Sequence, residues 1–235
     1  IRFAQVPVFA KAAVKAVLLL VYLQFDGVGE EPNSHRKVGN LYEVKQQAID
    51  NLNAAGVDVT LVTTIVNGLN NDQVGPIVQF LAKNIRKINS VSFQPVSFTG
   101  RDEDIDDETR KAQRYTISHL AYDMKAQLGV TEPMRDWFPL SASGPFSDLR
   151  DLLAGSSADW GALKCGCHPN CGAGFIMLVN EDTHEFVPVT QVLNTDRLVE
   201  DVTQINDSAR SRPWTVLQTA LAFLRNMKIS ELPAD

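Results

Sequence analysis

The stretch VDVTLVTTIV, residues Val57 to Val66, is rich in β-branched residues and predicts a strand. Two further apolar runs flank it and predict strands of the same kind: LLLVYLQFDG at Leu18 to Gly27 and VSFQPVSF at Val91 to Phe98. A helix is predicted in each interval between these strands. This alternation predicts an α/β fold with a parallel sheet that is either doubly wound or part of a barrel. Three strands are too few for a complete eight-stranded barrel of about 250 residues.

The first of these helices is predicted from residues spaced by three and four positions between Leu41 and Ala55, and Gly56 ends it. The predicted face is formed by Leu41, Val44, Lys45, Ala48, Ile49, Leu52 and Ala55. The second helix follows Asn71 and Asp72, which can cap it, and its apolar face is formed by Val74, Ile77, Val78 and Leu81.

The character of the chain changes near residue 130, which predicts two domains, residues 1–129 and 130–235. The acidic segment Arg101 to Glu108 predicts a solvated loop and helix start. A helix from Ile117 to Leu128 stops at Gly129, and prolines and glycines then predict a loop-rich region. Further on, FIMLVN and HEFVPV flank a turn and predict a hairpin. Helices are predicted at 196–205 and 214–226.

Charge and hydropathy exclude several classes of protein. The 235-residue chain has a formal net charge of -6, which argues against general binding to nucleic acid. Its longest apolar run, Ala16 to Leu23, is far shorter than the roughly 20 residues of a membrane-spanning helix. No secretory signal is recognisable, so we expect a cytoplasmic protein. Peripheral association with a membrane stays open, because it needs no spanning helix.

All cysteines of the chain lie in LKCGCHPNCGAGF, residues Leu163 to Phe175. Thiolates bind zinc, iron and iron–sulfur clusters, so Cys165, Cys167 and Cys171 predict a metal site. His168 is a candidate fourth ligand, and substrate or another part of the chain is the alternative. A structural zinc site and three cysteines without a metal also stay open.

Polar side chains follow each of the three predicted strands. Because the carboxyl ends of parallel strands meet at one edge of a sheet, these side chains suggest a shared pocket. They are Gln24, Asp26, Asn67, Asn70, Asn71, Gln94 and Arg101. The sequence contains no Walker loop, dinucleotide fingerprint or nucleophile elbow.

Five blocks of the chain resemble successive blocks of one enzyme family: VYLQFDGV, VTLVTTIVNGLNNDQVGPIVQF, SFQPVSFTGR, RDWFPLS and KCGCHPNCGAG. The family is that of the radical S-adenosylmethionine enzymes related to tetraether lipid synthase and the dihydro-hydroxymethylpterin dimethyltransferases. The resemblance covers nearly the whole chain.

This resemblance implies a partial (β/α) barrel followed by an α+β metal-binding extension. It implies a [4Fe-4S] cluster and S-adenosylmethionine, from which a 5′-deoxyadenosyl radical abstracts hydrogen from an unactivated carbon. Cys165, Cys167 and Cys171 fall in a family motif that holds an auxiliary cluster, with zinc as the alternative metal. Gln24, Asp26 and Gln94 are the residues expected to line the S-adenosylmethionine or substrate pocket.

The chain departs from the family in one respect. The chain lacks the Cys-x3-Cys-x2-Cys loop of the radical-generating cluster and the Gly-Gly-Glu-Pro-like strand end. In the family, both features lie upstream of the position that corresponds to Ile1. The chain therefore resembles the C-terminal part of such an enzyme and is not expected to generate a radical alone.

Three functions are consistent with the sequence. The first is joining of lipid chains by C–C bond formation, as in tetraether lipid synthesis, with a channel lined by Trp137, Phe138, Phe146 and Trp160, residues that would serve equally well as ordinary core. The second is methylation of a pterin precursor, and the third is a non-catalytic, metal-stapled binding module. For either enzyme we expect a small-molecule or lipid substrate and an electron donor such as ferredoxin or flavodoxin.

Overall fold

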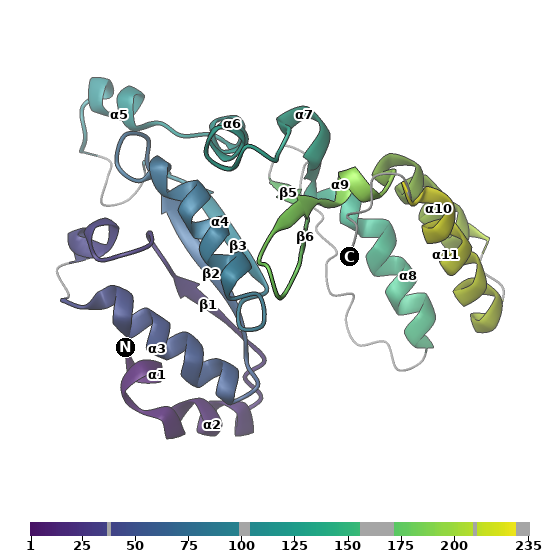
Figure 1. Ribbon diagram of the computed structural model, residues 1–235, viewed down its shortest axis with the longest axis horizontal. Helices are drawn as coiled ribbons and strands as arrows, with labels where there is room; N and C mark the ends of the chain where they lie inside the picture. The colour runs from purple at the N-terminus through teal and green to yellow at the C-terminus, as the bar shows by residue number, and fades with distance from the viewer. Residues whose placement is uncertain (37–38, 99–103, 156–171, 209–210, 229–235) are drawn as a thin grey trace. The chain divides into compact units, whose positions relative to one another are not determined.

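A computed structural model describes residues 1–36, 39–98, 104–155, 172–208 and 211–228 (Figure 1). The chain divides into two compact units. Unit 1 contains Ile1–Gly129 and Val179–Phe186, and unit 2 contains Val130–Leu178 and Val187–Asp235.

Unit 1 is built on a parallel sheet of three strands, β1 (Leu20–Gln24), β2 (Asp58–Ile65) and β3 (Ser90–Pro95), in the order β1-β2-β3. The crossover helices are α3 (Leu41–Ala54) and α4 (Val74–Lys83), the latter preceded by the short 3-10 helix η2 (Asn71–Gln73). The three predicted strands and both predicted helices are confirmed.

The strand order determines where the crossover helices lie. It never reverses, so right-handed crossovers place α3 and α4 on the same face. Phe25, just after β1, touches both helices: its ring centroid lies 6.0 Å from that of Tyr42 and 4.9 Å from that of Phe80. Both a barrel and one half of a doubly wound sheet have this winding, and the strands in the described residues do not close a barrel.

The core of unit 1 lies between the sheet and these helices. The buried residues of β2 on this side are Val59, Leu61, Thr63 and Ile65, and α4 contributes Val74, Ile77, Val78 and Leu81. Further helices are α1 (Arg2–Gln5), α2 (Pro7–Lys15), η1 (Glu31–Arg36), α5 (Asp107–Gln113) and α6 (Ile117–Leu128). The helix predicted at Ile117–Leu128 is confirmed, and Gly129 ends it with a φ of 73°.

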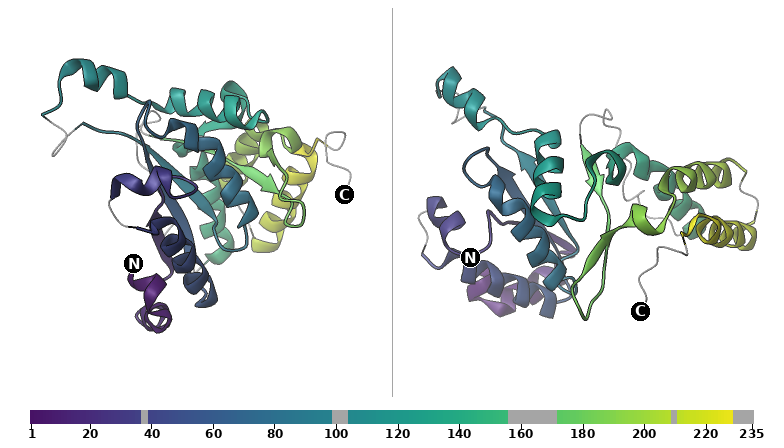
Figure 2. Two further views of the ribbon diagram at one scale, coloured as in Figure 1. Left: turned by 60° about the vertical axis from the view of Figure 1, so that its left-hand side comes forward. Right: turned by 45° about the horizontal axis from the view of Figure 1, so that its top comes forward.

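Unit 2 combines short strands with a group of helices. Its elements include α7 (Pro133–Asp136), β4 (Trp137–Pro139), η4 (Leu140–Ser143), α8 (Gly144–Ala154), β5 (Ala173–Phe175), α9 (Val189–Val192), α10 (Thr195–Asp207) and α11 (Arg212–Asn226). Helices α8, α10 and α11 lie side by side (Figures 1 and 2). Their core is formed by Leu149, Leu198, Val202, Ile205 and Ala222.

Two other sequence predictions for this half of the chain are confirmed. The predicted hairpin is β6 (Met177–Val179) with β7 (Phe186–Pro188), and the Asn180 side chain accepts hydrogen bonds from the amides of Asp182 and Thr183 in its turn. The two predicted C-terminal helices are α10 and α11.

The region predicted to be rich in loops contains the helix α8. Pro145, which suggested a loop, occupies the first turn of this helix, where a proline loses no hydrogen bond. Phe146 packs against the core of α8, α10 and α11, whereas the Trp137 ring stacks on Phe175 at 6.0 Å. Trp160 lies outside the described residues. Over the described part of the chain, no helix is both long and apolar enough to cross a membrane.

Candidate functional site

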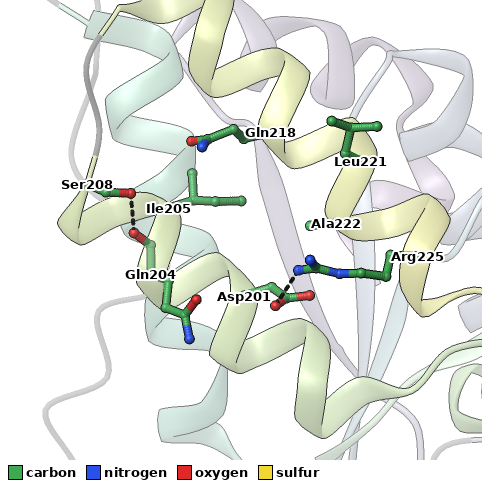
Figure 3. A pocket seen from close by; sticks show the side chains of 8 residues that line it. All are labelled: Asp201, Gln204, Ile205, Ser208, Gln218, Leu221, Ala222 and Arg225. Carbon is green, nitrogen blue, oxygen red and sulfur yellow. Dashed lines mark hydrogen bonds and ion pairs between the residues drawn. The ribbon is translucent and has the colours of Figure 1, made fainter.

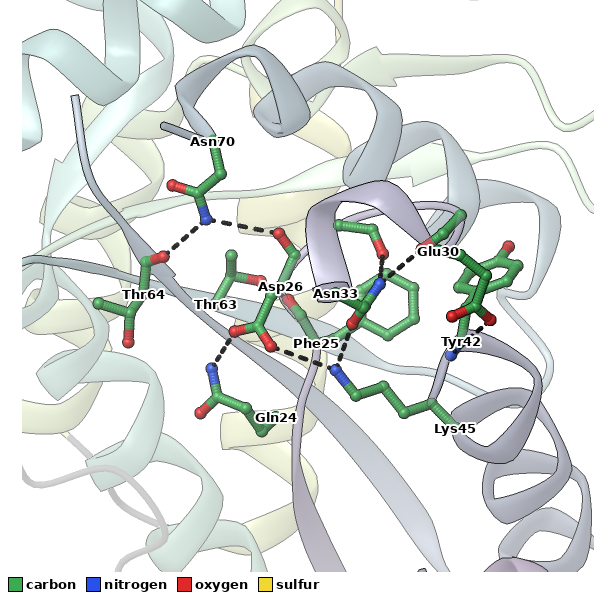
Figure 4. Close-up of polar contacts among 12 residues, drawn as sticks. Gln24, Phe25, Asp26, Glu30, Asn33, Tyr42, Lys45, Thr63, Thr64 and Asn70 are labelled. Atoms are coloured by element: carbon green, nitrogen blue, oxygen red, sulfur yellow. Dashed lines mark hydrogen bonds and ion pairs between the residues drawn. The ribbon is translucent and has the colours of Figure 1, made fainter. Parts of the chain in front are cut away.

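The carboxyl edge of the sheet gathers three of the residues predicted for a shared pocket, Gln24, Asp26 and Asn70 (Figure 4). Gln24 is the last residue of β1, and its Nε2 donates a hydrogen bond of 2.7 Å to Oδ1 of Asp26. The Nδ2 of Asn70, in the loop after β2, lies 3.4 Å from the backbone oxygen of Asp26. The structure therefore brings the ends of β1 and β2 into one polar cluster.

Asp26 of this cluster also forms a buried ion pair with Lys45. The Lys45 ammonium, on α3, is 3.3 Å from Oδ2 of Asp26 and donates a 2.6 Å hydrogen bond to Oδ1 of Asn33. All three side chains are buried. The Lys45 ammonium also lies 5.8 Å from the centroid of the Phe25 ring. Charges so far from water persist only when they are paired and hydrogen-bonded, which this arrangement provides.

Asn33 ties the loop after β1 to this pair. Its Nδ2 donates to the backbone oxygens of Gly27 and Gly29, at 3.1 Å and 2.6 Å, while its Oδ1 accepts from Lys45. The chain can approach this closely only because residue 27 is glycine: a Cβ there would overlap Cβ of Pro32 and lie 2.8 Å from its Cγ.

Asn70 joins the end of β2 to the same edge. Its Oδ1 accepts from the amide of Val66 at 2.9 Å, and its Nδ2 donates to the oxygen of Thr64 at 2.9 Å. The side chain is buried, so these hydrogen bonds replace those that water would give.

The face of the sheet opposite α3 and α4 is polar. The residues on this polar face, identified from the strand register, are Leu20, Tyr22, Gln24, Asp58, Thr60, Val62, Thr64, Ser90, Ser92 and Gln94. Gln24 is aligned with Val62 and Ser92, and Gln94 is aligned with Thr64. A parallel sheet that is buried on both faces would carry apolar side chains on each, so these amides and hydroxyls fit a face that is turned to water or to a polar ligand.

The other predicted residues of this pocket have different surroundings. Asn71 donates to Asp123 of α6 at 3.2 Å, and exposed Asn67 donates to the backbone oxygen of Ala112 at 2.8 Å. Gln94 is exposed on the polar face. Arg101 lies outside the described residues.

Asp123 also accepts a 2.7 Å hydrogen bond from the Tyr115 hydroxyl. Burial, followed by this hydrogen bond and the charge of Asp123, raises the pKa of Tyr115 well above its usual range. Asn71 thus ties the start of η2 to α6, and Tyr115 binds the same carboxylate from the segment before α6.

Sequence reasoning did not identify Lys45 and Asn33 as members of the polar cluster. Lys45 carried a signal, because it is a cation in an otherwise apolar helical stripe. Asn33 carried none, since it lies in a 3-10 helix without periodic apolar residues.

In unit 2, two blocks of the sequence that are far apart in the chain meet as antiparallel strands. Trp137 of β4 pairs with Phe175 of β5, and Pro139 pairs with Ala173. The amide of Leu140 donates a 3.1 Å hydrogen bond to the oxygen of Gly172, which anchors the chain directly after the cysteine segment.

The predicted metal ligands Cys165, Cys167, Cys171 and His168 lie outside the described residues. Within the described ranges, no three histidine, cysteine, aspartate or glutamate side chains gather closely enough to hold a metal ion.

Asp136, just before β4, is the buried charge of this region. Oδ2 accepts from the amide of Glu132 at 2.6 Å, and the carboxylate also accepts from the Arg135 guanidinium and the Thr190 hydroxyl. Burial opposes ionisation, but the hydrogen bonds from Arg135, Thr190 and Glu132 and the charge of Arg135 outweigh it and lower the pKa of Asp136. This carboxylate joins α7 to α9.

A hollow of about 280 Å³ lies between α10 and α11 (Figure 3). Arg225 and Asp201 line it as an ion pair at 2.5 Å. The hydrogen bond from Arg225, against the effect of burial, lowers the pKa of Asp201. All residues that line this hollow belong to unit 2, whereas the residues of the polar cluster belong to unit 1.

The fold and the polar cluster define an α/β protein with a candidate ligand site at the carboxyl ends of parallel strands. No family model matches the chain. A 7,8-dihydro-6-hydroxymethylpterin dimethyltransferase of Methanocaldococcus jannaschii is 32% identical over 195 residues, which are 83% of this chain and 37% of that protein. The chain is distantly related to that protein and spans little more than a third of its length. The predicted resemblance to the dihydro-hydroxymethylpterin dimethyltransferases is therefore confirmed as a distant relationship, whereas similarity to tetraether lipid synthase stays a prediction.

Proposed function

We propose that the chain is part of a radical S-adenosylmethionine enzyme that methylates a pterin precursor. The polar face of the sheet carries this proposal. A pterin ring presents a row of hydrogen-bond donors and acceptors along its edge, to which the amide oxygen of Gln24 and the amide of Gln94 can bind. A lipid chain would instead need an apolar wall.

The roles proposed for the chain's residues follow from this placement. Gln24 and Gln94 bind S-adenosylmethionine or the pterin precursor, and Asp26 orients Gln24 from the end of β1. S-adenosylmethionine binds to such a face at the carboxyl edge because this is where ligands of parallel α/β arrays bind. The distant relationship to a pterin dimethyltransferase supports the same substrate class.

The cysteine segment has the donor chemistry of an iron–sulfur site. Cys165, Cys167 and Cys171 would hold an auxiliary [4Fe-4S] cluster, because thiolates are the usual ligands of such clusters. His168 or substrate would supply the remaining ligand, and zinc is the alternative metal. When bound, the cluster supplies one-electron chemistry, for which we expect a ferredoxin or flavodoxin as the electron donor.

The metal is tested by anaerobic purification of the full chain, reconstitution with iron and sulfide, and measurement of iron, sulfide and zinc. We expect Cys171→Ala to lose one cluster, about four irons and four sulfides. One zinc without sulfide would contradict the cluster and leave a structural metal site.

The substrate is tested by measuring the binding of 7,8-dihydro-6-hydroxymethylpterin to the reconstituted chain by anaerobic calorimetry, because this chain alone is not expected to generate a radical. We expect the pterin to bind, with an affinity that Gln24→Ala reduces and Gln47→Ala leaves unchanged. Gln47 is the control because its amide binds Asn51 within α3 on the exposed surface. Binding of a lipid without binding of the pterin would contradict the proposal.

A further inference from the structure

The orientation of the Gln24 amide is determined by its neighbour. Nε2 of Gln24 lies 2.7 Å from Oδ1 of Asp26. A carboxylate only accepts hydrogen bonds, so the NH2 group of the amide must face it and the oxygen must point away. Figure 4 shows this orientation, with Oε1 of Gln24 directed away from Asp26.

Asp26 itself has little freedom to move. The Lys45 ammonium binds its other carboxylate oxygen at 3.3 Å, and Asn33 holds the ammonium at 2.6 Å from its own Oδ1. Both Asn33 amide hydrogens are used by Gly27 and Gly29, so the orientation of Asn33 is also determined. A chain of fixed donors and acceptors therefore runs from the loop after β1 to Gln24.

Gln24 therefore presents a hydrogen-bond acceptor at the carboxyl edge of the polar face. A group that is held before the ligand arrives loses little conformational entropy on binding and discriminates by hydrogen-bond type. An N–H group of the ligand can donate a hydrogen bond to Oε1 of Gln24. A hydrogen-bond acceptor of the ligand at this position would instead face the Gln24 oxygen and make no hydrogen bond.

We infer that Asp26, fixed by Lys45 and Asn33, is a positioning residue that makes Gln24 select a ligand N–H group. The inference rests on the proposed function, and both proposed ligands carry such groups: the ammonium and adenine amino groups of S-adenosylmethionine, and the ring N–H and amino groups of the pterin. Gln24 is the residue that touches the ligand, and Asp26 acts through it.

Reversing the direction of this hydrogen bond gives a specific test. In Asp26→Asn, Lys45 can only donate, so the new amide turns its oxygen to Lys45 and its NH2 group to Gln24. Gln24 must then flip and offer NH2 to the ligand. In Gln24→Glu, the new carboxylate faces the carboxylate of Asp26, and neither group can donate a hydrogen bond to the other.

The double variant with Gln24→Glu and Asp26→Asn restores the pattern. The new amide at position 26 donates to one oxygen of the new carboxylate at position 24, and the other oxygen of that carboxylate faces the ligand.

The affinities of the full chain for S-adenosylmethionine and for 7,8-dihydro-6-hydroxymethylpterin are measured separately by anaerobic calorimetry. We expect each single variant to weaken one ligand about 10- to 100-fold, and the double variant to return to within about threefold of wild type. The ligand that responds supplies the N–H group. Gln47→Glu is the matched control and is expected to change neither affinity.

Thermal unfolding of each variant separates folding from orientation, because a merely structural role of Asp26 would not be rescued by a second change at Gln24. Folded single variants with wild-type affinity would overturn the inference. So would a folded double variant that stays weak.

A measurement without ligand distinguishes failure of this inference from failure of the proposed function. In 15N-labelled protein, the side-chain NH2 signal of Gln24, assigned by its loss in Gln24→Ala, is expected to exchange with water more slowly than that of exposed Gln47. If wild type binds neither compound while this protection is present, the proposed function and the ligand assignment both fail, although the amide orientation is correct. Exchange as fast as that of Gln47 would show that the orientation itself is wrong.

Discussion

The ammonium of Lys45 lies 3.3 Å from a carboxylate oxygen of Asp26, and the two side chains are only 8% and 2% exposed. Removing one member of such a pair leaves a buried charge without compensation. We expect Lys45→Met to lower the free energy of unfolding by about 3–5 kcal/mol, as measured by urea denaturation.

Lys87→Met is the control for this variant. Lys87 forms a 2.6 Å pair with Asp50 in which both side chains are well exposed, so its loss is expected to change stability by less than about 1 kcal/mol. Equal losses in the two variants would contradict the role assigned to burial.

Gly27 is expected to tolerate no side chain. A Cβ at this position would overlap Cβ of Pro32 and lie 2.9 Å from Oε1 of Gln73, so Gly27→Ala must displace η1 and Asn33. We expect a loss of about 1–3 kcal/mol in the free energy of unfolding and weaker ligand binding. Gly39→Ala, where a Cβ would meet nothing within 4 Å, should be neutral. A neutral Gly27→Ala would show that this loop has room to adjust.

The sheet and its helices follow from signals that are local in the sequence. The β-branched run at Val57–Val66 and the stripe from Leu41 to Ala55 each bury one face of an element, and a periodic pattern records this directly. The same reasoning missed α8, because Pro145 at the start of a helix resembles a proline in a loop.

The polar cluster was predictable only in part. Gln24, Asp26 and Asn70 were found because residues at strand ends converge on one edge whatever their partners are. The partner of Lys45 could not be inferred, because Asp26 lies 19 positions away and reaches it only through the packing of α3 against the sheet. Asn71 was assigned to the pocket from its position in the sequence, but its side chain binds α6.

Asp136 should make the protein less stable in acid. Its pKa in the folded protein is lowered, so ionised Asp136 contributes stability above the carboxyl pKa of the unfolded chain, and this contribution is lost as the pH falls through the folded value. We expect Asp136→Asn to reduce the free energy of unfolding by about 1.5–3 kcal/mol at pH 7, with a difference that shrinks towards pH 3.

Urea denaturation at several pH values measures this difference. Asp107→Asn is the control, because the Asp107 side chain is 85% exposed and its pair with Arg110 lies on the surface. A difference between wild type and Asp136→Asn that stayed constant from pH 7 to pH 3 would rule out ionisation of Asp136 as its source.

Asn70 offers a test of hydrogen-bond polarity at the end of β2. Its Oδ1 accepts from Val66, while its Nδ2 faces the backbone oxygens of Thr64 and Asp26. Asn70→Ala leaves these buried groups unpaired and is expected to lower the free energy of unfolding by about 1–3 kcal/mol.

Asn70→Asp should be at least as damaging at pH 7, because a carboxylate oxygen then meets two carbonyl oxygens. In acid, the protonated carboxyl group can donate to Thr64, so Asn70→Asp should recover relative to Asn70→Ala. Exposed Asn67→Ala is the control, and its effect on stability is expected to be small and independent of pH. If Asn70→Asp were more stable than Asn70→Ala at pH 7, the amide of Asn70 would not be oriented as the structure shows.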